Sequence, residues 1–366
     1  MEIPIMLELS KSIKEIKQDS CIKITPKNKK VFVAMSGGVD SSVAAALLKE
    51  RGYDIIGVFM QGWPHPMATC SWKTERRDAM AAAAVLDIPF LTFDFSNEYY
   101  ESVVKYTLNE YAAGRTPNPD VMCNKYIKFG FFLKKALELE ADYIATGHYV
   151  RMDQNLKLSI AKDKNKDQSY FLWTLKQEQL KYCIFPIGDY EKSEVRKLAH
   201  KYKLPTADKK DSQGVCFIGQ LDMADFLREF IPKKKGNIVT SSGKKVGGHD
   251  GLYFYTIGQR HGMDIGGGGP YFIADKNFDT NTLIVAENEN DPILFKKELQ
   301  FTDANWLHAV EFPFECEARI RYRQPLQKCR VEKNKVVFEE PQRAIAPGQS
   351  VVFYRRNELL GGGIIS

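Results

Sequence analysis

The sequence predicts an α/β protein with an N-terminal doubly wound parallel sheet, a small central α+β region and a C-terminal β-barrel. Three observations support this. Apolar runs alternate with helical patterns from about residue 30 to 203, as in parallel sheets. The composition shifts near Leu204-Pro205 and becomes rich in glycine and aromatic residues. From about Phe278, polar and apolar residues alternate in short stretches at regular spacing, which is typical of a small barrel.

Length and composition favour several packed domains without a membrane segment. A chain of 366 residues with 44% hydrophobic residues is long enough for two or three cores. No apolar run reaches the roughly 18 residues that span a bilayer. The seven cysteines include no Cys-x-x-Cys pair, so they fit neither a zinc finger nor a disulfide scaffold. A reducing cytoplasm is therefore the expected compartment. The net charge of +6 is weak evidence for a nucleic-acid partner by itself.

We expect four segments along the chain. They are an extension (1–29), a catalytic nucleotide domain (30–204), a central domain (205–277) and a barrel (278–366). The extension carries four acidic residues and no long apolar core, which argues against a targeting signal.

The first domain is expected to gather its ligand groups at one edge of the sheet. The predicted strands are Val31–Met35, Ile55–Met60, Phe90–Phe93 and Tyr143–Thr146. The predicted helices are Ser42–Arg51, Glu75–Leu86, Glu98–Tyr111 and Tyr126–Leu139. Ligands of such sheets bind at the carboxyl ends of the strands. Met60 ends the second strand and would pack on an adenine base or simply in the core. Gly147 follows the fourth strand and would let a nucleotide approach.

A glycine loop follows the first strand, with the sequence Ser36-Gly-Gly-Val-Asp-Ser-Ser42. Glycines allow close approach of the backbone, and the amides of the loop and helix start then point at an anion. The loop lacks the lysine of a Walker motif, so it is predicted to hold a pyrophosphate through amides and hydroxyls. Asp40 would bind Mg²⁺ bridged to phosphate, or would be an acid stabilised by the helix dipole.

Two cysteines have different local settings. Cys123 stands near an expected helix start at Asn124, beside Lys125 and Lys128, which favours a lowered pKa and a nucleophilic role. The alternative for Cys123 is a small buried hydrophobe. Cys216 lies in an apolar patch between two glycines, a pattern that favours a buried strand.

Two later segments are compatible with RNA. The stretch 247–260 interleaves glycines with aromatic residues, which suits base stacking or tight hairpins equally. Arg319, Arg321 and Arg323 alternate along a predicted strand and would form a phosphate track or a solvated face. Gln349 lies in a turn from which it would reach a backbone.

Several collinear blocks together resemble the bacterial tRNA-specific 2-thiouridylases, a family of PP-loop ATP pyrophosphatases. The blocks are Ala34-Met-Ser-Gly-Gly-Val-Asp-Ser-Ser42, Gly114-Arg-Thr-Pro-Asn-Pro-Asp120, Cys123-Asn-Lys125, Ala145-Thr-Gly-His-Tyr149, Lys166-Asp-Gln-Ser-Tyr170, Gly214-Val-Cys-Phe-Ile-Gly219, Tyr255-Thr-Ile-Gly-Gln-Arg260, Arg321-Tyr-Arg-Gln324 and Ala344-Ile-Ala-Pro-Gly-Gln349. The resemblance runs from about Lys30 to the C-terminus and implies an adenine nucleotide alpha hydrolase-like first domain. The stretch from Trp63 to Thr74 departs from the acidic pattern expected there.

The resemblance also implies roles for individual residues. ATP would be bound by Ala34, Met35, Ser36, Gly37, Gly38, Val39, Asp40, Ser41, Met60 and Gly147. The target base would be contacted by Asn118, Pro119 and Asp120. Cys123 would be the nucleophile, Cys216 would carry a persulfide, and Asp120 would act as acid or base. The tRNA would be contacted by His148, Lys166, Asp167, Gln168, Arg321, Tyr322 and Gln349.

The implied reaction converts the wobble uridine of lysine, glutamate and glutamine tRNAs to 2-thiouridine, with Mg²⁺ and ATP as cofactors. ATP adenylates the C2 oxygen, and sulfur arrives as a persulfide from a cysteine desulfurase or a sulfur-relay protein. The persulfide attacks C2 directly or is reduced by Cys123 to hydrosulfide. Either route forms a transient Cys123–Cys216 disulfide.

Three other functions stay open at this point. An amide-forming ligase or tRNA lysidine synthetase would use the same loop without either cysteine. A tRNA-binding module would have a vestigial ATP site. An iron–sulfur protein would use Asp120, Cys123 and Cys216 as ligands.

Overall fold

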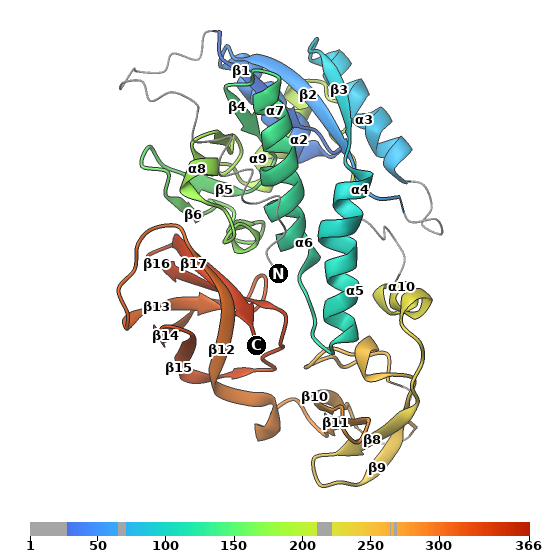
Figure 1. Ribbon diagram of the computed structural model, residues 1–366. Coiled ribbons are helices and arrows are strands. Elements are labelled where there is room, and N and C mark those ends of the chain that lie inside the picture. Colours follow the sequence, from blue (N-terminus) through green and yellow to red (C-terminus); the bar gives the residue numbers. More distant parts are fainter. Residues whose placement is uncertain (1–27, 65–70, 211–221, 264, 267–268) are drawn as a thin grey trace.

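The N-terminal domain is built on a five-stranded parallel sheet, which confirms the predicted doubly wound fold (Figure 1). The computed structural model describes residues 28–64, 71–210, 222–263, 265–266 and 269–366. The strand order is β3-β2-β1-β4-β7, and every neighbouring pair is parallel. The strands are β1 (Lys30–Ala34), β2 (Asp54–Gln61), β3 (Phe90–Asp94), β4 (Tyr143–Ala145) and β7 (Cys183–Ile184). The sequence predicted all but β7, which is too short to give a pattern.

Helices pack on both faces of this sheet. The helices of this part of the chain are α2 (Val39–Glu50), α3 (Ser71–Val85), α4 (Ser96–Tyr99), η1 (Tyr100–Val104), α5 (Lys105–Ala112), α6 (Pro119–Met122), η2 (Cys123–Phe131), α7 (Phe132–Glu138), η3 (Ser169–Phe171), α8 (Gln177–Leu180) and α9 (Lys192–Lys201). Successive residues of β1 enter different cores, because side chains alternate along a strand. Val31 and Val33 pack with α2, whereas Phe32 packs with the helices that carry Cys123.

One helix runs without interruption through α6, η2 and α7, with π-helical geometry over Cys123–Phe131. It begins earlier than the predicted start at Asn124. The Asn118 side chain accepts a hydrogen bond from the Val121 amide at 3.3 Å, and Pro119 occupies the first turn, where a missing N–H costs nothing. Cys123 therefore lies in the second turn of the helix rather than at its N-terminus.

The central domain is a four-stranded sheet with one helix. The elements are α10 (Met223–Phe230), β8 (Gly236–Thr240), β9 (Lys245–His249), η4 (Leu252–Phe254), β10 (Phe272–Asn277) and β11 (Thr282–Ala286), with the strand order β10-β11-β8-β9. The segment from Thr282 was expected in the barrel, yet it pairs in parallel with β8. Alternation identified this strand but not its sheet, because both sheets bury one face.

The C-terminal domain is a closed six-stranded barrel, as predicted. Its elements are η5 (Pro292–Leu294), β12 (Phe295–Trp306), β13 (Phe314–Arg319), β14 (Gln327–Val331), β15 (Lys335–Arg343), β16 (Ser350–Arg355) and β17 (Glu358–Ile365). The pairing of β12 with β17 closes the barrel. Two strands of the N-terminal part, β5 (Val150–Met152) and β6 (Leu158–Ile160), extend this sheet beside β17. The catalytic and barrel domains thus share a sheet.

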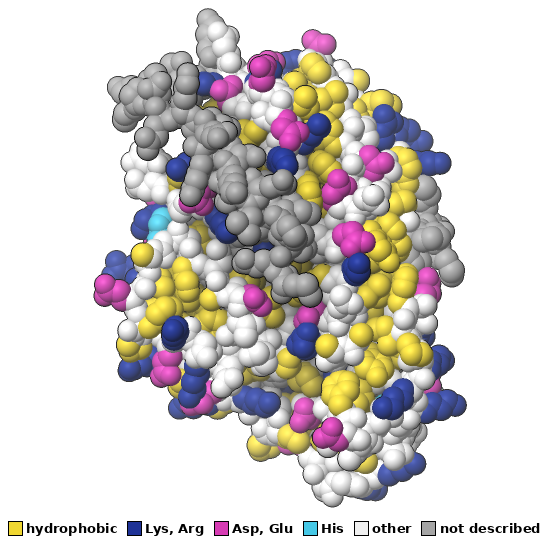
Figure 2. Space-filling model, viewed as in Figure 1, with side chains coloured by type: hydrophobic (Ala, Val, Ile, Leu, Met, Phe, Trp, Pro, Cys, Tyr) yellow, Lys and Arg dark blue, Asp and Glu magenta, His cyan; other side chains and the backbone are white. Residues whose placement is uncertain are grey.

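No helix among the described residues is long and apolar enough to cross a membrane. Basic and acidic side chains are interspersed on the face shown in Figure 2, rather than gathered into one basic patch.

Candidate active site

The PP-loop, defined here as residues 34–41, is held in shape by its own hydroxyl groups. The Ser36 amide donates to Ser41 Oγ at 3.2 Å, and Ser41 Oγ donates to the Gly38 carbonyl at 3.2 Å. Gly37 has a φ of +74°, and a side chain there would collide with the Glu75 carbonyl of α3. Only glycine satisfies both conditions at this position. The loop is therefore formed in advance of any ligand at the start of α2.

Asp40 has cationic and hydroxyl partners from distant parts of the chain. Lys192 Nζ lies 2.7 and 2.8 Å from the two Asp40 carboxylate oxygens. The Tyr149 hydroxyl donates to Asp40 Oδ1 at 2.8 Å. The charge that was expected to need Mg²⁺ is thus balanced by Lys192. Among the described residues, no group of three His, Cys, Asp or Glu side chains could hold a metal ion.

The segment Thr146–Tyr149 joins the PP-loop to the helix that carries Cys123. At Gly147 a side chain would lie 2.7 Å from the Ser41 amide, so the absence of a side chain lets this segment pack closely against the start of α2. The next residue, His148, packs against Phe129 of η2, with ring centroids 5.7 Å apart and the ring planes tilted by 40°. Its Nδ1 lies 2.7 Å from the Thr146 hydroxyl. Gly147 and His148, which follow β4, therefore contact the PP-loop and the helix that carries Cys123, respectively.

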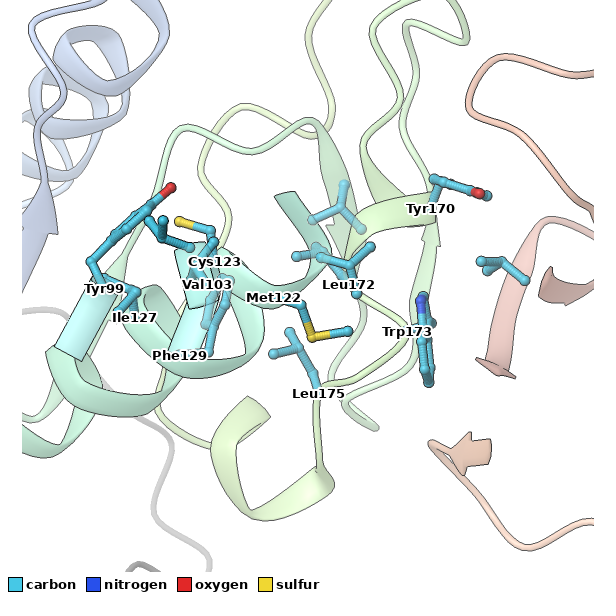
Figure 3. Packing of buried hydrophobic residues seen from close by; sticks show 14 of the residues in the cluster. Tyr99, Val103, Met122, Cys123, Ile127, Phe129, Tyr170, Leu172, Trp173 and Leu175 are labelled. Atoms are coloured by element: carbon cyan, nitrogen blue, oxygen red, sulfur yellow. The ribbon is translucent and has the colours of Figure 1, made fainter. Parts of the chain in front are cut away.

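Cys123 is buried, with 5% of its surface exposed, and its sulfur lies toward Tyr99 (Figure 3). Burial raises the pKa of the Cys123 thiol, while Lys128 lowers it and Asp120 raises it further. The predicted lowering of this pKa is therefore wrong for this conformation. The helix begins four residues before Cys123, so the thiol receives little benefit from the helix N-terminus, and the surrounding core removes solvent.

Asp120 and His148 share this enclosed environment. Burial raises the pKa of the Asp120 carboxyl, and Lys128 acts against it. Burial also lowers the pKa of His148 well below its ordinary value of 6.5, with Lys128 adding to the effect. His148 is therefore neutral at pH 7. The charge of Lys128 acts on the pKa of Asp120, Cys123 and His148 alike.

The loop Gly114–Pro117, which leads into the target-base motif, is hydrogen-bonded by both other domains. Gln349 Nε2 donates to the carbonyls of Thr116 at 2.9 Å and Pro117 at 3.1 Å. Lys276 Nζ donates to the Gly114 carbonyl at 3.0 Å. A cavity of about 210 Å³ lies at this junction, and burial lowers the pKa of Lys276 to about 8. Gln349, expected at the tRNA, here fixes the loop before Asn118.

Two of the arginines expected to form a phosphate track, Arg319 and Arg321, make hydrogen bonds within the protein instead. Arg319 Nη1 donates to Asp167 Oδ2 at 3.0 Å, and these side chains are 10% and 1% exposed. Arg321 Nη2 donates to the carbonyls of Ile257 at 3.2 Å and Ala344 at 2.7 Å. Only Arg323 is exposed, and its guanidinium lies over the Tyr322 ring. Strand β13 ends at Arg319, so the three side chains do not share one strand face.

The other expected tRNA contacts fall near this junction. Asp167 is enclosed, whereas Lys166 and Gln168 on either side are partly exposed. Gln168 Oε1 accepts a hydrogen bond from the Tyr149 amide at 3.0 Å. Tyr322 is partly exposed and packs on Phe171 with centroids 4.6 Å apart. Asp167 thus shapes the loop between two accessible side chains.

Met60 pairs in register with Phe93 and packs against the core that contains Cys123. This position fits the core alternative as well as contact with a base.

Cys216 and the Gly214–Gly219 block lie outside the described residues. On one side of that segment, Lys209 Nζ bonds to the Gly37 carbonyl at 3.0 Å and to Asp78 at 2.6 Å. On the other side, Phe226 of α10 lies 6.5 Å from the Trp63 ring, which is 5.5 Å from Tyr100. The described chain on both sides therefore packs beside the site.

Sequence reasoning missed Lys192, Tyr149 and Arg319 as partners of site residues. Lys192 and Asp40 are 152 positions apart, as are Arg319 and Asp167. No local pattern reports a pairing at that separation.

Comparisons with known proteins agree over nearly the whole chain. Residues 29–220 match the family model described as tRNA methyl transferase HUP domain. Residues 224–287 match its PRC-barrel domain, and residues 296–365 match an aminomethyltransferase beta-barrel domain. These limits place the end of the central domain beyond Ala286, in agreement with the pairing of β11.

Curated relatives match this chain at a sequence identity well above the level that a shared fold alone requires. The tRNA-specific 2-thiouridylase MnmA of Francisella philomiragia is 50% identical over 356 residues, covering 92% of this chain and 99% of that protein. The same enzyme of Francisella tularensis subsp. novicida is 49% identical over the same length and coverage. Among solved structures, the U34-tRNA thiolase NcsA of Methanococcus maripaludis has a TM-score of 0.36 and 18% identity, covering 62% of this chain and 74% of that one. Similarity at that level does not bear on function.

Proposed function

This chain belongs to the tRNA-specific 2-thiouridylase family, and from that premise we propose that it thiolates the wobble uridine of lysine, glutamate and glutamine tRNAs at C2. ATP adenylates the C2 oxygen, which turns a poor leaving group into AMP and releases pyrophosphate. Sulfur is supplied by a persulfide on Cys216. Because each turnover leaves a disulfide that must be reduced, the reaction belongs in a reducing cytoplasm.

The observation that carries the proposal is the bridge formed by Gly147, His148 and Tyr149. Gly147 abuts the Ser41 amide, and Tyr149 donates to Asp40 in the PP-loop. His148, between them, packs against Phe129 of the helix that carries Cys123. A phosphate-binding loop and a cysteine nucleophile are thereby held on adjoining elements. Adenylation and sulfur transfer at one base require such an arrangement.

The PP-loop supports ATP binding through its backbone. Amides at the start of α2 face an anion favourably, and the Ser36 hydroxyl, 3.4 Å from Ser41 Oγ, adds a donor. The described residues around Asp40 do not form a magnesium site, because Lys192 and Tyr149 occupy the carboxylate. Mg²⁺ would then enter only with the nucleotide, and we assign it no protein ligand.

The target base would enter beside Asp120 and Cys123, which are three residues apart on one helix face. The raised pKa of Asp120 favours its protonated form, which suits a carboxyl that gives a proton and takes it back. The Cys123 thiol needs contact with solvent or tRNA to ionise, since burial raises its pKa here. Substrate binding is therefore expected to open this core locally.

Electrons balance along either sulfur route. The terminal persulfide sulfur displaces AMP from C2, and the Cys123 thiolate then attacks Cys216 Sγ, which releases the thiocarbonyl and forms the disulfide. Alternatively, Cys123 attacks Cys216 Sγ first, and the expelled hydrosulfide displaces AMP. Both routes end with a Cys123–Cys216 disulfide that an external thiol reduces.

The test is mass analysis of nucleosides from unmodified glutamate tRNA after incubation with the protein, Mg-ATP and a persulfide donor. We expect 2-thiouridine and AMP with the wild type, and no 2-thiouridine with Cys123→Ser or Cys216→Ser. Cys183→Ser is the matched control, because Cys183 is also a buried free cysteine of this domain. AMP without sulfur in the wild type would contradict thiolation. AMP release without 2-thiouridine in both the wild type and Cys216→Ser would favour a ligase, and 2-thiouridine from Cys216→Ser would contradict the persulfide role of Cys216. The absence of both products would favour an RNA-binding module.

A further inference from the structure

The PP-loop contains no lysine, but Lys192 supplies one from another element. Lys192 is the first residue of α9, and its side chain is 13% exposed. Its Nζ binds both carboxylate oxygens of Asp40, the second residue of α2. It also lies 5.9 Å from the Tyr149 ring centroid. The ammonium group is therefore fixed beside the N-terminus of the helix that follows the phosphate loop.

We propose that Lys192 is the phosphate-binding lysine of this site, that it contacts the pyrophosphate portion of ATP, and that Asp40 is the residue that positions it. The inference rests on the proposed use of ATP. In this proposal Asp40 positions Lys192 and does not bind Mg²⁺ directly.

The charge balance supports a ligand. The start of α2 carries roughly half a positive charge from the helix dipole, and Lys192 adds one that Asp40 balances. The pair alone therefore leaves this corner of the site positive. A triphosphate brings several negative charges to the same amides. A lysine has three donors on one nitrogen, so one ammonium group is able to bind a carboxylate and a phosphate oxygen together.

The surroundings also favour a binding role over a purely structural one. A partly buried ion pair adds little net stability compared with apolar residues of similar size, because both ions lose water. The Tyr149 hydroxyl orients the same carboxylate. The side chains of Asp40 and Tyr149 thus fix the Lys192 ammonium group beside the start of α2. Lys209, the other described lysine bonded to this loop, contacts the Gly37 carbonyl and Asp78 instead.

The test compares ATP with AMP as titrants of the full-length protein, using wild type, Lys192→Ala, Lys192→Gln and Lys192→Arg. ATP binding is expected to weaken about 10- to 100-fold in the Ala and Gln variants, in line with a charge-assisted hydrogen bond. AMP binding should stay within about twofold, since AMP lacks the pyrophosphate portion, and Arg should restore part of the ATP affinity. Lys197→Ala is the control, because Lys197 is exposed on the same helix.

Asp40→Asn separates the two roles of the carboxylate. If Asp40 positions Lys192, this variant loses ATP affinity like Lys192→Ala and needs no more Mg²⁺ for half-maximal AMP release. The inference is overturned if Lys192→Ala and Lys192→Gln bind ATP as the wild type does, or if ATP and AMP affinities fall together. It is also overturned if only Asp40→Asn raises the Mg²⁺ requirement. Absence of tRNA-dependent AMP release in the wild type would contradict the proposed function instead.

Discussion

Replacing Arg319 by methionine is expected to destabilise the protein without changing its electrostatic contact with tRNA. Arg319 and Asp167 form a buried ion pair between the barrel and the catalytic domain. Without the guanidinium, the Asp167 carboxylate retains, among the described residues, the Ser169 hydroxyl and the amides of Ser169 and Ala161 as hydrogen-bond donors. A buried charge is then left without a counter-charge.

The size of the effect follows from that burial. Removing one partner of a buried ion pair costs about 3–5 kcal/mol in the free energy of unfolding. Within the described structure Arg319 Nε has no hydrogen-bond partner, so the wild-type pair is not fully satisfied. We therefore expect a loss near the lower end, about 3 kcal/mol. Asp167→Asn combined with Arg319→Met should recover part of this loss, because the remaining amide is neutral.

The assay pairs urea unfolding with tRNA binding over a range of salt concentrations. Arg319→Met should shift the unfolding midpoint and leave the slope of log affinity against log salt unchanged. Arg323→Met is the matched control, since this exposed side chain should change stability by no more than about 0.5 kcal/mol. A salt slope smaller by about one for Arg319→Met, with stability unchanged, would refute the structural role and restore the phosphate track.

Three further predictions concern the site itself. His148 is buried and neutral, with its pKa well below 6.5, so on acidification the unfolded chain takes up this proton before the folded protein does. The free energy of unfolding should therefore fall as the pH drops below about 6.5, by up to ~1.4 kcal/mol per pH unit. Urea titrations at several pH values should show that His148→Gln removes this part of the acid sensitivity. Because burial raises the pKa of Cys123, iodoacetamide at pH 8 should alkylate it more slowly than a free thiol, as followed by peptide mass analysis. Alkylation should be slower still in Lys128→Met, since Lys128 lowers this pKa. Alkylation at the free-thiol rate would contradict this. Gln349→Glu places a carboxylate against the Thr116 carbonyl and removes two hydrogen bonds of about 1 kcal/mol each. Thiolation should slow about 10- to 30-fold, and the affinity for ATP should stay unchanged. Weaker tRNA binding as the sole effect would instead indicate that Gln349 contacts tRNA directly.

The sequence alone determined the features that depend on neighbouring residues. Val31–Met35 followed by glycines and an alanine-rich stretch predicts strand, loop and helix, because these conformations depend on side-chain period and backbone freedom within a few residues. The same local logic predicted a barrel of short strands in the C-terminal part and placed Cys123 beside Asp120. It failed at the start of the Cys123 helix, where Asn118 caps the chain earlier than the apolar pattern indicates.

Tertiary structure decided which charges are satisfied and which groups are buried. The pKa of Cys123 rises because the core of Figure 3 excludes water, although its neighbours in sequence are lysines. Asp40 is paired with Lys192, and Asp167 with Arg319, through contacts between elements 152 positions apart. Electrostatic energies depend on distance and solvent exposure in the folded state, and a linear sequence specifies neither until the chain has packed.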